Sequence, residues 1–148
     1  MSIVYLVVPC YNEEAVLPET VKELTQQLQG MIQSGLADEK SRMLFVDDGS
    51  KDHTWKLIEK FHSENPFVNG LKLAHNRGHQ NALLAGLMTA KDEADCAISL
   101  DADLQDDISV LPQFVQKFQE GCDIVYGVRK KRETDTWFKR TRQKVFTN

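Results

Sequence analysis

Apolar residues along the chain fall into two patterns, short continuous runs and longer stretches with helical spacing. The first run, at 3–9, is rich in β-branched residues, which is typical of a strand buried on both faces. From Leu17 to Leu28, apolar residues recur at spacings of four, three and four, which predicts a helix over 13–32 with one apolar face. The chain therefore opens with a buried strand followed by an amphipathic helix.

The two patterns alternate to the end of the chain. Helical spacing predicts helices at 53–63, 81–90 and around 111–118, and further apolar runs predict strands at 43–46, 68–73, 97–100 and 124–128. Asp52 is a candidate N-cap for the helix at 53–63, and the helix at 81–90 is apolar nearly all round, so we expect it to be buried. This alternation predicts an α/β fold, a Rossmann-like, doubly wound and mostly parallel sheet with helices on both faces.

Polar clusters follow three of the predicted strands, at 9–13, 47–50 and 101–106. Ligands of such sheets bind beyond the carboxyl ends of the strands, so these clusters are the place to look for chemistry. A single acidic turn after a strand often serves only to form the turn, because Asp, Asn and Ser side chains hydrogen-bond nearby backbone groups and Gly adopts turn conformations. For the cluster at 47–50 that interpretation stays open beside a functional one.

The cluster at 101–106 has the pattern of a metal site. Asp101 and Asp103 are separated by one small residue, so both carboxylates can reach one ion. Mg²⁺ and Mn²⁺ prefer oxygen ligands, and Gln105 can add another oxygen or a supporting hydrogen bond. A solvated acidic loop without a metal remains the alternative.

The other strand ends offer groups suited to a nucleotide. Asp47 and Asp48 can accept hydrogen bonds from a uracil imide or from ribose hydroxyls. Glu13 can accept from a ribose hydroxyl or act as a first-turn helix residue, and both interpretations stay open. Arg77 can pair with a phosphate, while His75 and His79 are expected to be surface or capping residues rather than metal ligands.

Composition narrows the class of protein. Hydrophobic residues make up 41% and charged residues 27% of 148, as in folded globular proteins, and a net charge of −4 argues against a nucleic-acid partner. Eight Lys or Arg residues against two acids at 129–144 suit phosphates or an anionic membrane surface. Three scattered cysteines suggest neither a disulfide framework nor a zinc site. No apolar run approaches the roughly 20 residues of a membrane span, so we expect these residues to be soluble and cytoplasmic.

Four motifs, read in order, resemble one family. They are VVPCYNEE, VDDGSKDHT, NRGHQNALLAG and SLDADLQDD, and together they resemble the family 2 glycosyltransferases with the GT-A fold. Within that family they are most similar to dolichyl-phosphate mannose synthases and bacterial polyprenyl-phosphate (bactoprenol) glucosyltransferases. The resemblance covers essentially the whole chain.

The resemblance implies roles for matching residues. Pro9, Tyr11, Glu13 and Asp48 match nucleotide-contacting segments, with Asp47 beside them. A metal and diphosphate site is implied at Asp101, Asp103 and Gln105, where Mg²⁺ or Mn²⁺ would stabilise the leaving diphosphate. The resemblance also places Arg129 and Arg132 near a basic segment that engages donor or acceptor phosphate, although a solvated charge run explains them equally well.

The resemblance further implies an inverting transfer of a hexose from UDP-glucose or GDP-mannose to polyprenyl phosphate. A phosphate acceptor is already ionised near neutral pH and needs no general base. Because family members continue well past residue 148, we expect residues 1–148 to be one N-terminal nucleotide-sugar-binding domain that ends within the acceptor region. The full-length enzyme is then expected at the cytoplasmic face of the membrane.

Other hypotheses remain open at this point. A saccharide acceptor, as in cell-wall or capsule synthesis, keeps the same donor chemistry. A receiver-like domain that accepts phosphate would need one acceptor Asp and a Lys such as Lys130, and leaves the Asp-x-Asp pair unexplained. A donor-binding module without turnover is a third alternative. The motifs fix neither the sugar nor the oligomeric state.

Overall fold

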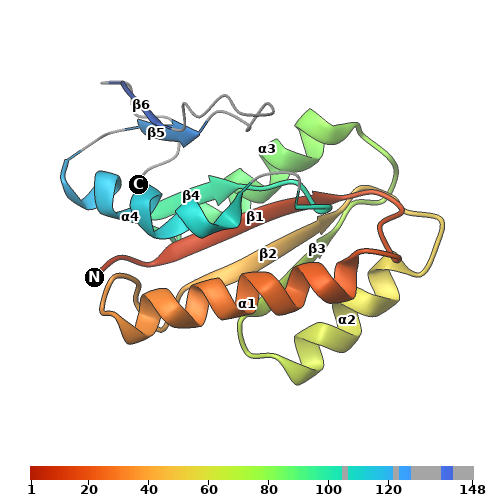
Figure 1. The fold of residues 1–148 in the computed structure, drawn as a ribbon. Coiled ribbons are helices and arrows are strands. Elements are labelled where there is room, and N and C mark those ends of the chain that lie inside the picture. The colour runs from red at the N-terminus through yellow and green to blue at the C-terminus, as the bar shows by residue number, and fades with distance from the viewer. Residues whose placement is uncertain (105–106, 122–123, 128–137, 142–148) are drawn as a thin grey trace.

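Four parallel strands form the sheet at the centre of the molecule (Figure 1). This computed structural model describes residues 1–104, 107–121, 124–127 and 138–141. The strand order is β3-β2-β1-β4, and the strands are β1 (Val4–Cys10), β2 (Arg42–Asp47), β3 (Val68–Lys72) and β4 (Cys96–Ser99). The predicted α/β fold with a parallel sheet is confirmed. An unpredicted strand, β6 (Phe138–Thr141), pairs in antiparallel fashion with β5 (Ile124–Gly127).

Helices cover both faces of the sheet because the strands are apolar on both sides. Residues such as Val4, Leu6 and Val8 point into a core shared with α1 (Leu17–Gln33), α2 (Thr54–Glu64) and α4 (Leu111–Gln119), which follows the short 3-10 helix η1 (Ile108–Val110). Val7, between them in sequence, points to the opposite face and packs with α3 (His79–Ala90). Figure 1 shows α1 and α2 on one face and α3 on the other.

Two helix starts differ from the prediction. Helix α1 begins at Leu17 instead of residue 13, because the N–H groups of Val16 and Leu17 both donate to the Glu13 carbonyl and close a turn first. Helix α2 has His53 at its N-cap position, so the prediction that Asp52 is the N-cap was wrong by one residue. Asp52 still satisfies the first helical N–H, since its Oδ1 accepts from Thr54 N at 2.9 Å.

The prediction that α3 is buried was also wrong. Its buried residues are all small, Ala82, Gly86 and Ala90, whereas Leu84 and Met88 are 55% and 56% exposed. The small face lets the helix approach the sheet closely. A Cβ at Gly86 would lie only 2.5 Å from Val7 Cγ1 and 2.8 Å from Val46 Cγ2.

This close approach predicts opposite effects for two glycine-to-alanine changes. Both gain up to about 1 kcal/mol of helix propensity. Gly30, on the exposed side of α1, has open space at its Cβ position, so Gly30→Ala should stabilise the protein. Gly86→Ala overpacks the core, and we expect it to be less stable than Gly30→Ala by about 1–3 kcal/mol in chemical denaturation. Equal stability of the two variants would contradict the close packing of α3.

Candidate functional site

The carboxyl ends of the central strands open into one pocket of about 410 Å³. Strand β1 lies between β2 and β4, with Cys10 opposite Asp47 and Val7 opposite Ser99, so the loops after all three strands emerge side by side. The pocket is lined by Pro9, Cys10, Tyr11, Glu13, Asp48, Asn76, Gly78, His79, Asp101, Ala102 and Asp103. The structure therefore brings together six of the residues expected from the sequence, namely Pro9, Tyr11, Glu13, Asp48, Asp101 and Asp103.

Two non-glycine residues with positive φ shape the loops beside the acidic groups. Asn12 has φ 53° and Leu104 has φ 52°. Such a conformation costs about 1–3 kcal/mol and persists only where the surroundings enforce it. For Asn12 they do so, because Ser50 Oγ accepts its N–H and its own Oδ1 accepts from Lys51 N, both at 2.8 Å. The N–H of Leu104 donates to the Asp101 carbonyl at 3.1 Å and closes the turn that carries Asp103.

Asp48 builds one wall of the pocket. Its side chain is buried, and its two carboxylate oxygens accept from Arg77 N at 2.6 Å and Gly78 N at 3.1 Å. These bonds hold the loop between β3 and α3 against the end of β2. Arg77 therefore meets the site through its backbone, and its exposed side chain is not among the lining groups.

Asp47 lies beneath the pocket and not in it. Its side chain is 1% exposed, Oδ1 accepts from Ser50 N at 3.2 Å, and Oδ2 has no partner among the described residues. The bond to Ser50 closes a local turn, which favours turn chemistry at this position. Nucleotide contact through Asp47 would require the buried side chain to become accessible.

Glu13 carries its carboxyl group into an acidic environment. Burial raises the pKa of this carboxyl, and Asp103, Asp52 and Asp101 raise it further in that order. Asp101 and Asp103 line the same pocket as Glu13. Within the described ranges, no three His, Cys, Asp or Glu side chains are grouped to hold a metal unaided. Two carboxylates suit Mg²⁺ or Mn²⁺ that takes its remaining ligands from water and phosphate.

The acidic environment of Glu13 predicts a pH-dependent gain in stability for Glu13→Gln. Because the pKa of Glu13 is raised in the folded state, its contribution to the free energy of unfolding is fully present below the ordinary value of 4.5. That contribution is lost as the pH rises through the folded-state pKa. In buffer with EDTA, Glu13→Gln should therefore melt above the wild type at pH 7 and level with it near pH 4. Glu39→Gln, an exposed acid at the other end of β2, is the control. A lower melting temperature for Glu13→Gln at pH 7 would contradict the account.

Several lining residues were not expected from the sequence. Asn76 lies in the loop after β3, and His79 is the first residue of α3. Because the carboxyl end of β3 lies at the same edge of the sheet, their place after this strand could have predicted that they line the pocket. Cys10 has the sequence pattern of an ordinary core residue. Burial raises the pKa of its thiol, with Glu13 and Asp47 adding to the effect, so it stays protonated and is a poor nucleophile.

Three predicted phosphate or metal residues, Gln105, Arg129 and Arg132, lie outside the described residues, as does Lys130. In the part of the chain that the structure does describe, none of the helices is both long and apolar enough to cross a bilayer.

The acidic, polar pocket lies at the carboxyl ends of the strands, where α/β domains with a parallel sheet bind their ligands. Residues 5–148 match the family described as Glycosyl transferase family 2, and the chain belongs to this family. The family assignment leaves the receiver-domain alternative without support.

Relatives support the same assignment. Over 136 residues the chain is 60% identical to YkoT of Bacillus subtilis (strain 168), described as an uncharacterized glycosyltransferase, covering 92% of this chain and 40% of that protein. It is 35% identical over 153 aligned positions to the bactoprenol glucosyl transferase of Shigella phage SfV, covering 96% of this chain and 46% of that protein. The chain thus spans less than half the length of these relatives.

Solved structures share the fold. A mannosyltransferase from Pyrobaculum calidifontis, in complex with GDP-mannose and Mn²⁺, superposes with a TM-score of 0.71 at 21% identity, over 88% of this chain and 36% of that one. The Staphylococcus aureus protein TarS, residues 1–349, in complex with UDP-GlcNAc, gives a TM-score of 0.62 at 20% identity over 90% of this chain and 37% of that one. The expected GT-A glycosyltransferase fold is confirmed.

Proposed function

We propose that the protein to which this chain belongs transfers a hexose from UDP-glucose or GDP-mannose to polyprenyl phosphate with inversion. The observation that carries the proposal is the convergence of Asp101, Asp103, Tyr11 and Asp48 around one pocket at the strand ends. Two comparisons support it: the phage relative is a bactoprenol glucosyl transferase, and the mannosyltransferase of similar fold binds GDP-mannose with Mn²⁺.

On the donor side, the proposal assigns two groups of residues. Pro9, Tyr11, Glu13 and Asp48 face the nucleotide, and Asp47 supports them from below. Asp101 and Asp103, with Gln105, hold Mg²⁺ or Mn²⁺, which supplies positive charge to the leaving diphosphate when bound. The backbone of Arg77 is bonded to Asp48 in the pocket wall, and its exposed guanidinium is available to a donor phosphate.

On the acceptor side, the chemistry needs little from the protein beyond alignment. An oxygen of the ionised acceptor phosphate forms the new bond to the anomeric carbon while the bond from that carbon to the donor diphosphate breaks. Because the acceptor carries no proton to be removed, no general base is required. The basic stretch at 129–144, with Arg129, serves the phosphates and the anionic surface of the cytoplasmic leaflet.

The test is calorimetry of UDP, GDP and CDP sugars with the chain, with and without Mn²⁺, followed by transfer assays on the full-length protein. We expect one nucleotide class to bind in a Mn²⁺-dependent way, and the full-length protein to glycosylate polyprenyl phosphate. Binding of no nucleotide sugar would overturn the proposal. Transfer to an oligosaccharide in place of polyprenyl phosphate would overturn its acceptor half.

A further inference from the structure

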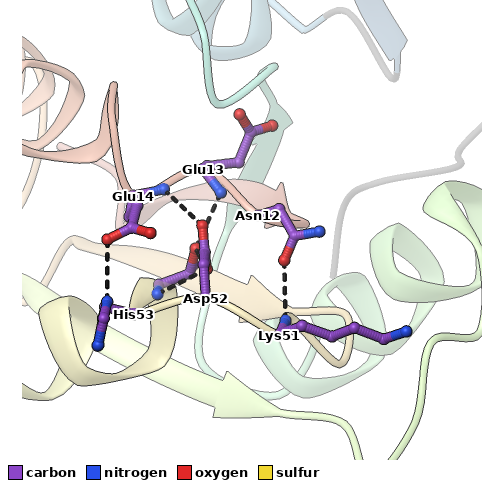
Figure 2. A network of polar contacts seen from close by, with 7 residues as sticks. Asn12, Glu13, Glu14, Lys51, Asp52 and His53 are labelled. Atoms are coloured by element: carbon purple, nitrogen blue, oxygen red, sulfur yellow. Dashed lines mark hydrogen bonds and ion pairs between the residues drawn. The ribbon is translucent and has the colours of Figure 1, made fainter.

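Two loops from distant parts of the sequence are tied together beside the pocket (Figure 2). The loop after β1 contributes Asn12, Glu13 and Glu14, and the loop before α2 contributes Lys51 and Asp52. The first of these loops also carries Tyr11 and Glu13, two residues that line the pocket. Whatever fixes this loop therefore fixes part of the pocket wall.

Besides the bonds of Asn12 to Ser50 and Lys51, the tie includes a buried hydroxyl group. Thr54, the first residue of α2, is 0% exposed, and its Oγ1 accepts from Glu13 N at 2.8 Å. The same hydroxyl donates to Asp52 Oδ1 at 2.5 Å, and that oxygen also accepts from Thr54 N at 2.9 Å. The hydroxyl thus donates its one proton to Asp52, and one of its lone pairs accepts the N–H of Glu13. We call this chain of bonds, from Glu13 N through Thr54 Oγ1 to Asp52, the Asp52–Thr54 relay.

Asp52 extends the relay to the next residue of the loop. Its Oδ2 accepts from Glu14 N at 3.3 Å. Burial raises the pKa of the Asp52 carboxyl, but the hydrogen bonds from Thr54 and Glu14 outweigh it and hold this pKa below its ordinary value. Asp52 is therefore ionised at neutral pH and acts only as an acceptor. Outside the relay, Glu14 and His53 form a pair at 3.2 Å that is exposed to solvent.

The relay binds the backbone of Glu13 and leaves its side chain for the pocket. Figure 2 shows the Glu13 carboxylate pointing away from Asp52, while its backbone nitrogen faces the loop that carries Asp52. In the absence of the Thr54 hydroxyl, the Glu13 N–H would lose its acceptor within a partly buried loop. The loop would then adopt other conformations, and Tyr11 and Glu13 would move with it.

We infer that Thr54 and Asp52 are positioning residues for the nucleotide-sugar donor, acting through the backbone of Glu13. This inference rests on the proposed function, because it assumes that the pocket binds the donor. Neither side chain is among the groups that line the pocket. Groups that orient a metal ligand typically change metal affinity by about 10–100-fold when removed, and we expect the lower end of that range for groups that orient this loop.

The test compares Thr54→Val with Thr54→Ser. Valine keeps the volume of threonine and removes the hydroxyl, whereas serine keeps the hydroxyl. We expect Thr54→Val to weaken Mn²⁺-dependent binding of the nucleotide sugar selected by calorimetry about tenfold, and Thr54→Ser to stay within about twofold. Thr89→Val is the control, since the Thr89 hydroxyl donates only to Ala85 O within α3.

A second measurement follows the relay without any ligand. Hydrogen exchange of the Glu13 amide, read by NMR, should be slow in the wild type and in Thr54→Ser and faster in Thr54→Val. Should Thr54→Val fail to fold, Asp52→Ala keeps the Thr54 hydroxyl but removes the carboxylate that orients it and that accepts from Glu14 N, and the same direction of change is expected.

The outcomes separate the inference from the proposed function. If the wild type binds a nucleotide sugar and Thr54→Val binds it equally well, the inference is wrong and the proposed function stands. Unchanged exchange of the Glu13 amide in Thr54→Val would likewise overturn the inference. If the wild type binds no nucleotide sugar but exchange of the Glu13 amide changes as expected, the proposed function is wrong. The relay then orders the loop without a role in donor binding.

Discussion

Replacing Asp103 with asparagine is expected to weaken Mn²⁺-dependent nucleotide-sugar binding by about 100-fold or more. Loss of groups that merely support a metal ligand already costs about 10–100-fold, so loss of a ligand should reach at least the upper end. Asp103 is exposed on the loop after β4 and lines the pocket beside Asp101. The change removes one negative charge where a cation would bind and preserves the shape of the side chain.

The stability of Asp103→Asn distinguishes this effect from unfolding. An exposed substitution is expected to change the free energy of unfolding by no more than about 0.5 kcal/mol, measured in EDTA. Asp92→Asn makes the same chemical change on an exposed acid in the turn before β4, outside the pocket, and should leave binding intact. Undiminished Mn²⁺-dependent binding by Asp103→Asn would refute the assignment of Asp103 to the metal.

Replacing Gly49 with alanine should both destabilise the protein and damage the pocket. Gly49 has φ +71°, and an added Cβ would lie 2.5 Å from Asn76 N and 2.6 Å from His75 C. These neighbours are backbone atoms, so the loop between β3 and α3 must shift. With about 1–2 kcal/mol for the backbone conformation and about 1–3 kcal/mol for overpacking, we expect a loss of about 2–5 kcal/mol in chemical denaturation.

The matched control is Gly35→Ala. Gly35 also has a positive φ, +80°, but open space surrounds its Cβ position. Its replacement should therefore cost only the conformational part, about 1–2 kcal/mol. The difference between the two variants measures the contact of Gly49 with the loop that carries Asn76 and Gly78. Equal losses would show that this contact carries no energy, and nucleotide binding would then be unaffected by Gly49→Ala.

The sequence predicted the sheet well because its strands are buried on both faces. A short, uninterrupted apolar run such as that of β1 is typical of a strand buried on both faces, and it differs clearly from the helical spacing that follows it. Helix α3 was misjudged for a related reason. Its composition is apolar all round, but the sheet packs closely against the side with Ala82 and Gly86, and Leu84 on another side of the helix is exposed. Periodicity does not report how near two elements pack.

The pocket was predictable where a residue directly follows a strand and not where the backbone does the binding. Tyr11, Asp101 and Asp103 lie where the strand ends indicated. Asp48 also lies at a strand end and lines the pocket as expected, but its carboxylate accepts from the N–H groups of Arg77 and Gly78, which are distant in sequence. No spacing rule reveals such a bond. The start of α1 was likewise misplaced, since the turn closed by Val16 N and Leu17 N on the Glu13 carbonyl leaves no trace in the apolar spacing.

The parallel sheet has a consequence for how the pocket comes into existence during folding. Its walls come from segments after β1, β2, β3 and β4, and each parallel pairing needs a long crossover before the next can form. Such non-local pairing is slow, and no early fragment of the chain holds a complete set of walls. A tightly bound nucleotide sugar would therefore recognise only the fully assembled sheet. Recovery of binding after dilution from denaturant should then lag behind recovery of helical circular dichroism.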